Sequence, residues 1–271
     1  MEGYLKDNLD VFARKIVDDQ MFVILITGSG FVRVGKSVLA QQIGKYLTSK
    51  INELHKKDNN FDLNNVVFKG KELQEIAYKL PQYSVLDLDE GDDLVEHYWS
   101  SLAKDLRRFF RKAGQLNNFV ILVLPDFFEL PKNYAITRSM CLINVKYMGQ
   151  FDRGYFDFYS FENKKKLYLK GKKQADYKAI SPNFSGRFTN VYTVDEEKYR
   201  EKKRVDLEEE DEEEEKTNKQ VKKETIRDLF KEVYSYLNEE LKLKIKVKEL
   251  VKPFGVSRAS GYNFLNKLSK I

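Results

Sequence analysis

The chain has 271 residues, 42% of them hydrophobic, which predicts a globular protein with one large domain and a small appendage. Its net charge is +6. Its apolar runs fall short of the roughly 20 residues of a membrane helix, so we expect no membrane span. Its mixed, acidic N-terminus is unlike a signal peptide. A single cysteine, Cys141, and two distant histidines exclude a disulfide framework and a Cys/His zinc site, and they predict a reducing, cytoplasmic location.

Alternating apolar and amphipathic segments predict an α/β fold for residues 1–200. A β-branched run predicts a buried strand at 21–27, and apolar residues at helical spacing predict a helix after the glycine-rich loop that follows it. Further strands are expected at 66–68, 83–90, 119–124 and 139–148, with helices at 71–80 and 95–110. This order is typical of a mostly parallel sheet flanked by helices.

The composition of the sequence changes at residue 153, where aromatic residues and lysines surround a polar turn. We interpret residues 153–173 as an antiparallel β-hairpin at the edge of the domain. Its aromatic and basic side chains could stack bases and neutralise phosphates, but an ordinary hairpin that is half core and half surface is the simpler interpretation.

Charge is segregated in the last third of the chain. Glu208–Glu215 carries −8, whereas residues 216–271 contain 14 Lys and Arg against 6 Asp and Glu. Residues 201–223 are nearly all charged or polar and cannot bury a core, so we interpret them as a linker, with partial helix as one option. The basic body and basic tail favour a polyanionic partner such as DNA.

A glycine-rich loop separates the first strand from its helix. Gly30–Ser37 fits the pattern G-x-x-x-x-G-K-[ST], in which backbone N–H groups surround phosphates, Lys36 neutralises the β and γ oxygens, and Ser37 binds Mg²⁺. We therefore expect ATP and Mg²⁺ as cofactors, with an ordinary glycine turn as the alternative. The predicted cofactor-binding residues are Gly30, Phe31, Val32, Arg33, Val34, Gly35, Lys36, Ser37 and Val38.

The acidic end of the strand at 83–90 supplies the second half of the predicted site. Asp89 is expected to join Ser37 in holding Mg²⁺, and Glu90 to act as the general base that activates water. Asp87 is the competing choice for the metal, and a plain exposed loop carboxylate is the alternative for the motif. Lys36 and Glu90 are therefore the main predicted catalytic residues.

These two segments resemble the Walker A and Walker B motifs of the additional-strand catalytic-glutamate division of P-loop NTPases. Over roughly residues 20–150 the arrangement is similar to Zot-like, FtsK/HerA-type and terminase-like ATPases of mobile elements. The resemblance implies a homo-oligomeric ring, such as a hexamer, in which an arginine reaches a neighbour's γ-phosphate. The candidates for that arginine are Arg108, Arg111 and Arg138. The sequence departs from the family at Leu124-Pro125-Asp126, where these motors often carry a Gln, Asn or Thr sensor.

Residues 224–271 resemble a DNA-binding helix-turn-helix. A short helix is followed by a turn at Gly255 and by a second helix with Ser257 as its N-cap. Gly261 inside that second helix is a poor helix former, and a protein-docking helical hairpin is the alternative. The residues available to the major groove are Arg258, Ser260 and Asn263.

The sequence thus favours an ATP-hydrolysing DNA motor or loader, of translocase, packaging or transfer type, from a virus, plasmid or integrated element. The second hypothesis is a nucleotide-switched DNA-binding regulator, or a partition or replication adaptor, in which turnover is incidental. A small-molecule kinase is disfavoured because Glu90 suits water activation and the basic tail has no role in such an enzyme.

Overall fold

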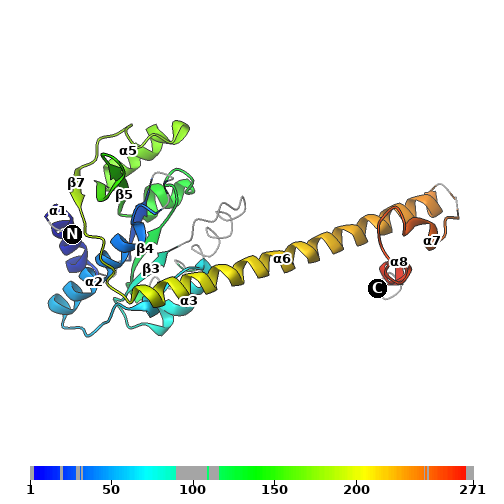
Figure 1. The fold of residues 1–271 in the computed structure, drawn as a ribbon, viewed down its shortest axis with the longest axis horizontal. Helices are drawn as coiled ribbons and strands as arrows, with labels where there is room; N and C mark the ends of the chain where they lie inside the picture. Colours follow the sequence, from blue (N-terminus) through cyan, green and yellow to red (C-terminus); the bar gives the residue numbers. More distant parts are fainter. Residues whose placement is uncertain are drawn as a thin grey trace. The chain divides into compact units, whose positions relative to one another are not determined.

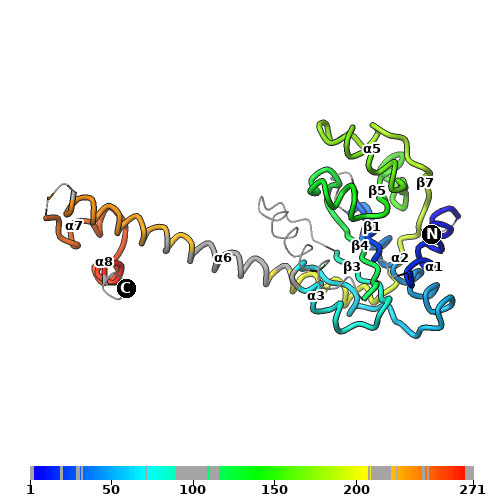
Figure 2. Tube along the Cα trace, turned by 180° about the vertical axis from the view of Figure 1, so that it is seen from behind, coloured from blue at the N-terminus to red at the C-terminus, as the bar shows by residue number. Residues whose placement is uncertain are grey.

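The structure, a computed structural model, describes residues 3–18, 21–28, 31, 33–89, 109, 116–240, 242 and 244–266. The chain forms two compact units, Met1–Leu207 and Glu208–Ile271. The division falls inside the segment interpreted as a linker, and helix α6 (Glu196–Ser235) runs through that whole segment (Figure 1; Figure 2). The two units are described separately below.

The first unit is built on a sheet that has seven strands among the described residues, in the order β2-β3-β4-β1-β5-β6-β7. Neighbours from β2 to β5 are parallel, whereas β6 is antiparallel to both β5 and β7. The strands are β1 (Phe22–Thr27), β2 (Val66–Val67), β3 (Val85–Asp89), β4 (Phe119–Val123), β5 (Cys141–Met148), β6 (Asp152–Tyr159) and β7 (Phe184–Arg187). The α/β fold with a mostly parallel sheet expected from the sequence is confirmed.

Helices cover both faces of this sheet, and the alternation of side chains along β1 shows how. Phe22, Ile24 and Ile26 pack in one apolar cluster with α1 and α2. Val23 and Leu25 point to the other face and pack with α3 and α5. The helices and short helical turns of this unit are α1 (Tyr4–Lys15), α2 (Lys36–His55), η1 (Leu63–Asn65), α3 (Gly70–Lys79), η3 (Tyr134–Arg138), α5 (Phe161–Gly171) and η4 (Lys172–Gln174).

The hairpin predicted at residues 153–173 is wrong in its second half. β6 occupies the first half, but α5 occupies the second, because Lys164, Leu167, Tyr168 and Gly171 recur at helical spacing and are buried together. The antiparallel edge of the sheet does exist. It is formed by β5 and β6, joined by a short turn, and is extended by β7.

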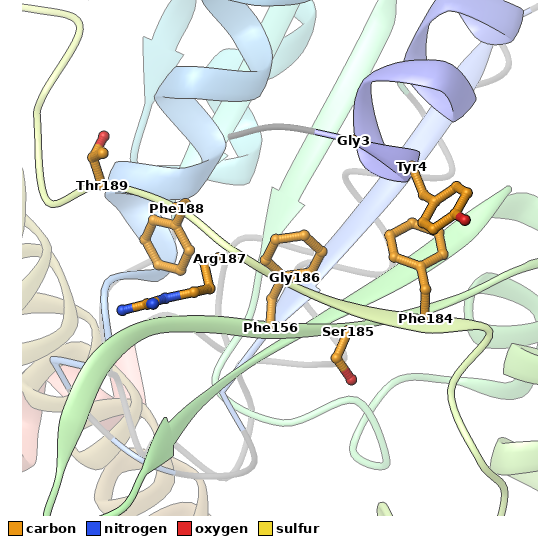
Figure 3. A pocket seen from close by; sticks show the side chains of 9 residues that line it. All are labelled: Gly3, Tyr4, Phe156, Phe184, Ser185, Gly186, Arg187, Phe188 and Thr189. Carbon is orange, nitrogen blue, oxygen red and sulfur yellow. The ribbon is translucent and has the colours of Figure 1, made fainter.

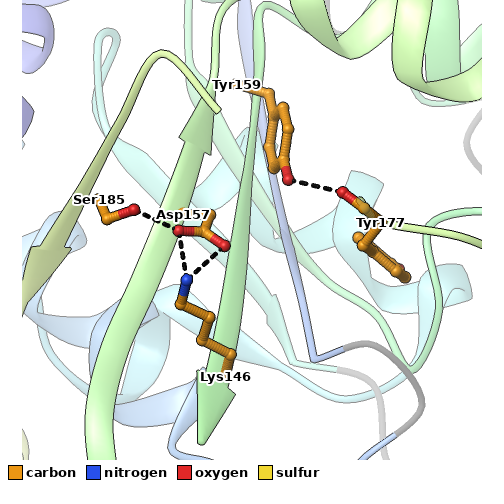
Figure 4. A network of polar contacts seen from close by, with 5 residues as sticks. All are labelled: Lys146, Asp157, Tyr159, Tyr177 and Ser185. Atoms are coloured by element: carbon orange, nitrogen blue, oxygen red, sulfur yellow. Dashed lines mark hydrogen bonds and ion pairs between the residues drawn. The ribbon is translucent and has the colours of Figure 1, made fainter. Parts of the chain in front are cut away.

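A polar network crosses this antiparallel edge (Figure 4). On β5, the Lys146 ammonium donates to both carboxylate oxygens of Asp157 on β6, at 2.7 Å each. The Ser185 hydroxyl on β7 donates to the same carboxylate at 2.5 Å. Nearby, the Tyr159 hydroxyl donates to the backbone oxygen of Tyr177 at 3.0 Å. These bonds connect three successive strands with one another and with the loop that precedes β7.

A lysine is buried where η3 meets the start of β5. The Lys164 ammonium donates to the backbone oxygens of Ala135, Ile136 and Ser139 at 2.8, 3.2 and 2.6 Å, and to the Ser139 hydroxyl at 2.7 Å. These carbonyls end a helical turn, a position that favours a cation. Burial nevertheless lowers the pKa of Lys164 to about 8 and raises the pKa of the neighbouring Cys141 thiol to about 12.

The second unit is a small helical cluster formed by the C-terminal part of α6, η5 (Tyr236–Glu240), α7 (Val247–Leu250) and α8 (Arg258–Asn266). Its apolar core consists of Phe230, Val247, Leu250, Val251 and Phe264. The predicted N-cap is confirmed, because the Ser260 amide donates to the Ser257 hydroxyl at 3.1 Å. A Cβ at Gly261 would lie 2.8 Å from Val251 Cγ1, so glycine allows α8 to pack closely on α7.

Within the described ranges, no helix combines the length and the apolar character that are needed to cross a bilayer.

Candidate nucleotide-binding site

The carboxyl end of β1 leads into a tightly folded loop. The Phe31 amide donates to the Gly28 carbonyl oxygen at 2.9 Å. A Cβ at Gly28 would lie 2.9 Å from Val34 Cγ2 and 3.0 Å from the Phe31 oxygen, so the turn excludes a side chain at this position. Val34 is fully buried in the core and anchors the far side of the loop.

The loop ends where α2 begins. Gly35 has a φ of 101°, in the left-handed region that favours glycine, and the Leu39 amide donates to its carbonyl oxygen at 3.1 Å in the first helical turn. The N-terminus of this 20-residue helix carries a partial positive charge, which favours an anion. A strand, a glycine-dependent loop and a helix N-terminus therefore follow one another as the motif predicts.

The predicted loop residues differ in exposure. Phe31 is exposed and its ring lies edge-on to Tyr147, and Arg33 is exposed with a φ of 57°. Lys36 and Ser37 are half-buried, and Val38 is buried in the core. The two other predicted residues of the loop, Gly30 and Val32, lie outside the described residues.

Two buried carboxylates lie on β3, and one strand, β4, separates β3 from β1. Asp87 and Asp89 occupy the face of the sheet that α2 covers, since Val85 packs in the same cluster as α2 whereas Leu86 and Leu88 pack on the other face. Asp87 is fully buried, and neither of its carboxylate oxygens has a hydrogen-bond partner among the described residues. Burial, and then the negative charge of Asp89, raises the pKa of Asp87 well above its usual range.

Asp89 contacts two side chains from the beginning of α6. The Tyr199 hydroxyl donates to Asp89 Oδ2, and Lys203 Nζ lies 3.7 Å from Asp89 Oδ1. Burial, and then the Asp89 carboxylate, raises the pKa of Tyr199. Tyr199 therefore occupies one oxygen of a carboxylate that was predicted to hold the metal.

Tyr199 and Lys203 were not among the residues predicted for this site. They lie 110 and 114 positions after Asp89, at the boundary of a segment that was interpreted as a charged linker. Their i, i+4 spacing places them on one face of a helix, which is the only local signal that could have singled them out.

The residues present fit a magnesium ion by the chemistry of their donors. Among the described residues, no group of three or more His, Cys, Asp or Glu side chains could hold a metal ion by itself. A serine hydroxyl and one carboxylate, completed by phosphate oxygens and water, are however a usual ligand set for Mg²⁺. Buried side-chain polar atoms of Asp87 and Gln41 also lack hydrogen-bond partners among the described residues. Gln41 lies one helical turn after Ser37, so polar groups are buried on this side of the sheet.

Of the predicted catalytic residues besides Lys36, the structure describes Arg138. Glu90, Arg108 and Arg111 lie outside the described residues. Arg138 is exposed at the end of η3, before the N-terminal end of β5. The phosphate loop follows the carboxyl end of the parallel strand β1, so Arg138 lies toward the opposite edge of the sheet from the loop of its own chain.

Polar side chains also gather beyond the ends of β1 and β4, where the family sensor was expected. The Asp126 carboxylate accepts a hydrogen bond from the Tyr177 hydroxyl at 2.7 Å, and the Thr27 hydroxyl lies 3.4 Å from the Asn144 side-chain oxygen. Burial, and then the negative charge of Asp126, raises the pKa of Tyr177. Asp126 is thus held in place by Tyr177 at the end of β4.

A groove of about 590 Å³ adjoins the loop (Figure 3). Its lining residues are Gly3, Tyr4, Phe156, Phe184, Ser185, Gly186, Arg187, Phe188 and Thr189. The Phe188 ring lies against the loop, because a Cβ at Gly35 would be 3.2 Å from Phe188 Cζ. The Gln42 side chain on α2 donates to the Thr189 oxygen at 2.7 Å and holds this wall of the groove on the helix.

Comparison of the chain with protein-family models, with curated proteins and with solved structures found no match in any of the three.

Proposed function

We propose that the chain is an ATP-hydrolysing DNA motor or loader that binds magnesium-ATP at the loop after β1. The observation that carries the proposal is the glycine-dependent loop at Gly28 and Gly35, which leads from β1 directly into the N-terminus of α2. The buried Asp89 on β3, with β4 as the one strand between β3 and β1, supports it further.

Each residue has a defined role in this proposal. Lys36 neutralises the β and γ oxygens, and the N–H groups at the start of α2 bind the phosphates. Ser37 and Asp89 hold Mg²⁺, which when bound supplies positive charge to the same phosphate oxygens. Glu90, the residue after Asp89, accepts a proton from the attacking water.

The groove beside Gly35 is the proposed position of the nucleotide base. It begins at the Phe188 ring next to the loop, and its lining includes the exposed ring of Tyr4 and the half-buried ring of Phe184. Aromatic faces suit a planar base, since stacking of a base on an aromatic ring contributes about 1–3 kcal/mol. An adenine bound there would remain connected to phosphates at the loop.

DNA is the proposed partner of the second unit. Arg258 and Asn263 are exposed on α8, while Gly261 and Phe264 are buried on its opposite side. The surplus of positive charge in residues 216–271 would neutralise phosphates, and the exposed face of α8 would contact base edges. A homo-oligomeric assembly, with an arginine of one copy serving the site of the next, completes the proposal.

Nucleotide hydrolysis by two variants tests the site directly. Lys36→Ala is expected to lose ATP binding, because the loop then lacks the cation that neutralises the β and γ oxygens. Glu90→Gln is expected to keep ATP binding and to lose hydrolysis by several orders of magnitude, because only the proton acceptor is removed. Wild-type turnover in Lys36→Ala would refute the nucleotide site.

The contact of α6 with Asp89 favours a second candidate, a nucleotide-switched DNA-binding regulator, because it links the site to a helix outside the sheet. Stimulation of ATP hydrolysis by duplex DNA separates the two candidates. A motor should hydrolyse ATP faster with DNA, whereas a regulator should bind DNA differently with and without ATP and turn over slowly in both cases.

A further inference from the structure

Both oxygens of the Asp89 carboxylate are engaged by the start of α6. Tyr199 donates to Oδ2, and the Lys203 ammonium lies 3.7 Å from Oδ1. Asp89 is 1% exposed, so these contacts take the place of water around the carboxylate. A cation of this chain therefore already compensates the charge on which the proposed metal site depends.

The start of α6 is fixed in this position by contacts on either side. Lys202 Nζ donates to the backbone oxygens of Leu63 and Val66, at 3.1 and 2.5 Å. One turn later, Asp206 lies 3.8 Å from the Lys69 ammonium, and both side chains are largely buried. The contact with Asp89 is thus part of a built interface, unlike an isolated surface ion pair, which contributes little.

The aromatic surroundings support the same arrangement. The Tyr199 ring packs against Phe68 and Tyr192, with ring centroids 5.6 Å apart in both pairs, and Lys203 Nζ lies 5.7 Å from the centroid of the Phe68 ring. Tyr199, Lys203 and Asp206 recur at i, i+4 and i+7, so one face of α6 makes all of these contacts. We call residues 196–206 the α6 cover.

A divalent ion and the Lys203 ammonium compete for the same carboxylate. Mg²⁺ requires close oxygen ligands, whereas the ammonium and the tyrosine hydroxyl use the lone pairs of the Asp89 oxygens as hydrogen-bond or ion-pair partners. Two positive charges at one buried carboxylate also repel each other strongly, because water screens them little there.

We propose that the α6 cover holds the site in a metal-excluding form, and that loading of magnesium-nucleotide displaces Lys203 and Tyr199 from Asp89. This inference rests on the proposed nucleotide site and adds a regulatory element to it. The cover lowers the apparent affinity for magnesium-nucleotide, because only chains in which it has moved are competent to bind. Binding would in turn release the first turns of α6.

The test is a magnesium titration of nucleotide binding by the full-length chain, with a fluorescent ATP analogue as the probe. Lys203→Met keeps an unbranched side chain of similar length beside Phe68 and removes the charge. We expect it to lower the Mg²⁺ concentration for half-maximal binding by about 10-fold. The matched control is Lys198→Met on the same helix, whose side chain is 75% exposed and pairs with Asp195, and which should behave like wild type.

A second variant and a second measurement test the proposal even if Lys203→Met fails to fold. Tyr199→Phe removes only the hydroxyl and should shift the magnesium dependence in the same direction. Hydrogen exchange of the amides in residues 196–206 should speed up in the wild type when Mg²⁺ and the ATP analogue are added together, and should stay unchanged with either alone.

The outcomes are distinguishable. If the wild type binds no ATP analogue at any Mg²⁺ concentration, the proposed function fails and the cover fails with it. If it binds, but Lys203→Met has an unchanged magnesium dependence or a weaker affinity, only the cover fails, and weaker affinity would make Lys203 a ligand of the phosphates. Slower exchange of residues 196–206 in the loaded state would equally overturn the displacement.

Discussion

Replacement of Lys164 by methionine should destabilise the first unit, and the loss should grow with pH. Four acceptors surround the ammonium. At about 1.5 kcal/mol for each bond to a charged donor, their loss costs about 6 kcal/mol. Methionine also removes the unfavourable burial of the charge, which corresponds to about 3 kcal/mol for a pKa of about 8 instead of 10.5. We expect a net loss of about 3 kcal/mol at pH 7.

The pH dependence follows from the sign of the same shift. Between pH 8 and 10.5 the unfolded chain holds a proton on Lys164 that the folded chain releases, so the stability of the wild type rises with pH in this range. Below pH 8 both states are protonated and the contribution is lost. The difference between wild type and Lys164→Met should therefore increase from about 3 toward about 6 kcal/mol as the pH rises.

Urea unfolding followed by far-ultraviolet circular dichroism, at several pH values between 7 and 10, measures this difference. Lys165→Met is the matched control, because that neighbouring side chain is exposed on the same helix. Tyrosines that titrate at high pH are common to all three proteins and cancel in the comparison. A difference that stays constant from pH 7 to 10 would refute the reasoning, and would mean that the four acceptors fully compensate the burial of the ammonium.

Three further outcomes are expected. With a fluorescent ATP analogue as the probe, Asp89→Asn should raise the Mg²⁺ concentration for half-maximal binding more than Asp87→Asn does. The reverse order would identify Asp87 as the metal ligand. Tyr4→Ala should weaken binding of ATP several-fold and leave binding of inorganic triphosphate unchanged, because Tyr4 lines the groove and is 72% exposed. Deletion of residues 216–271 should lower the affinity for duplex DNA and reduce the slope of log affinity against log salt by roughly one unit for each lost phosphate contact. An unchanged slope would favour a protein-docking role for the tail.

The strands of the first unit were predictable because their signal is local. Buried parallel strands read as short apolar, β-branched runs, and the runs at 21–27, 119–124 and 139–148 became β1, β4 and β5. α1 was not predicted although Leu5, Leu9 and Ala13 recur at helical spacing, because charged and polar residues separate these apolar positions in its first turns.

The contacts that complete the candidate site could not be predicted in the same way. Tyr199 and Asp89 are 110 residues apart, and nothing near either residue specifies the other. Helical spacing in residues 161–171 was hidden because the aromatic residues there suit a strand equally well. Residue pairs that tertiary packing alone brings together leave no periodic trace in a sequence.

Because Cys141 is buried, the reactivity of its thiol can report how often the sheet opens. This thiol is the single cysteine of the chain, it is 1% exposed on a strand paired with β1 and β6, and its pKa is raised to about 12. A thiol reagent must reach the sulfur atom and reacts with the thiolate. In the folded sheet the sulfur is buried and the thiol stays protonated. Under native conditions the rate of alkylation therefore counts the openings of the centre of the sheet, without any label having to be introduced.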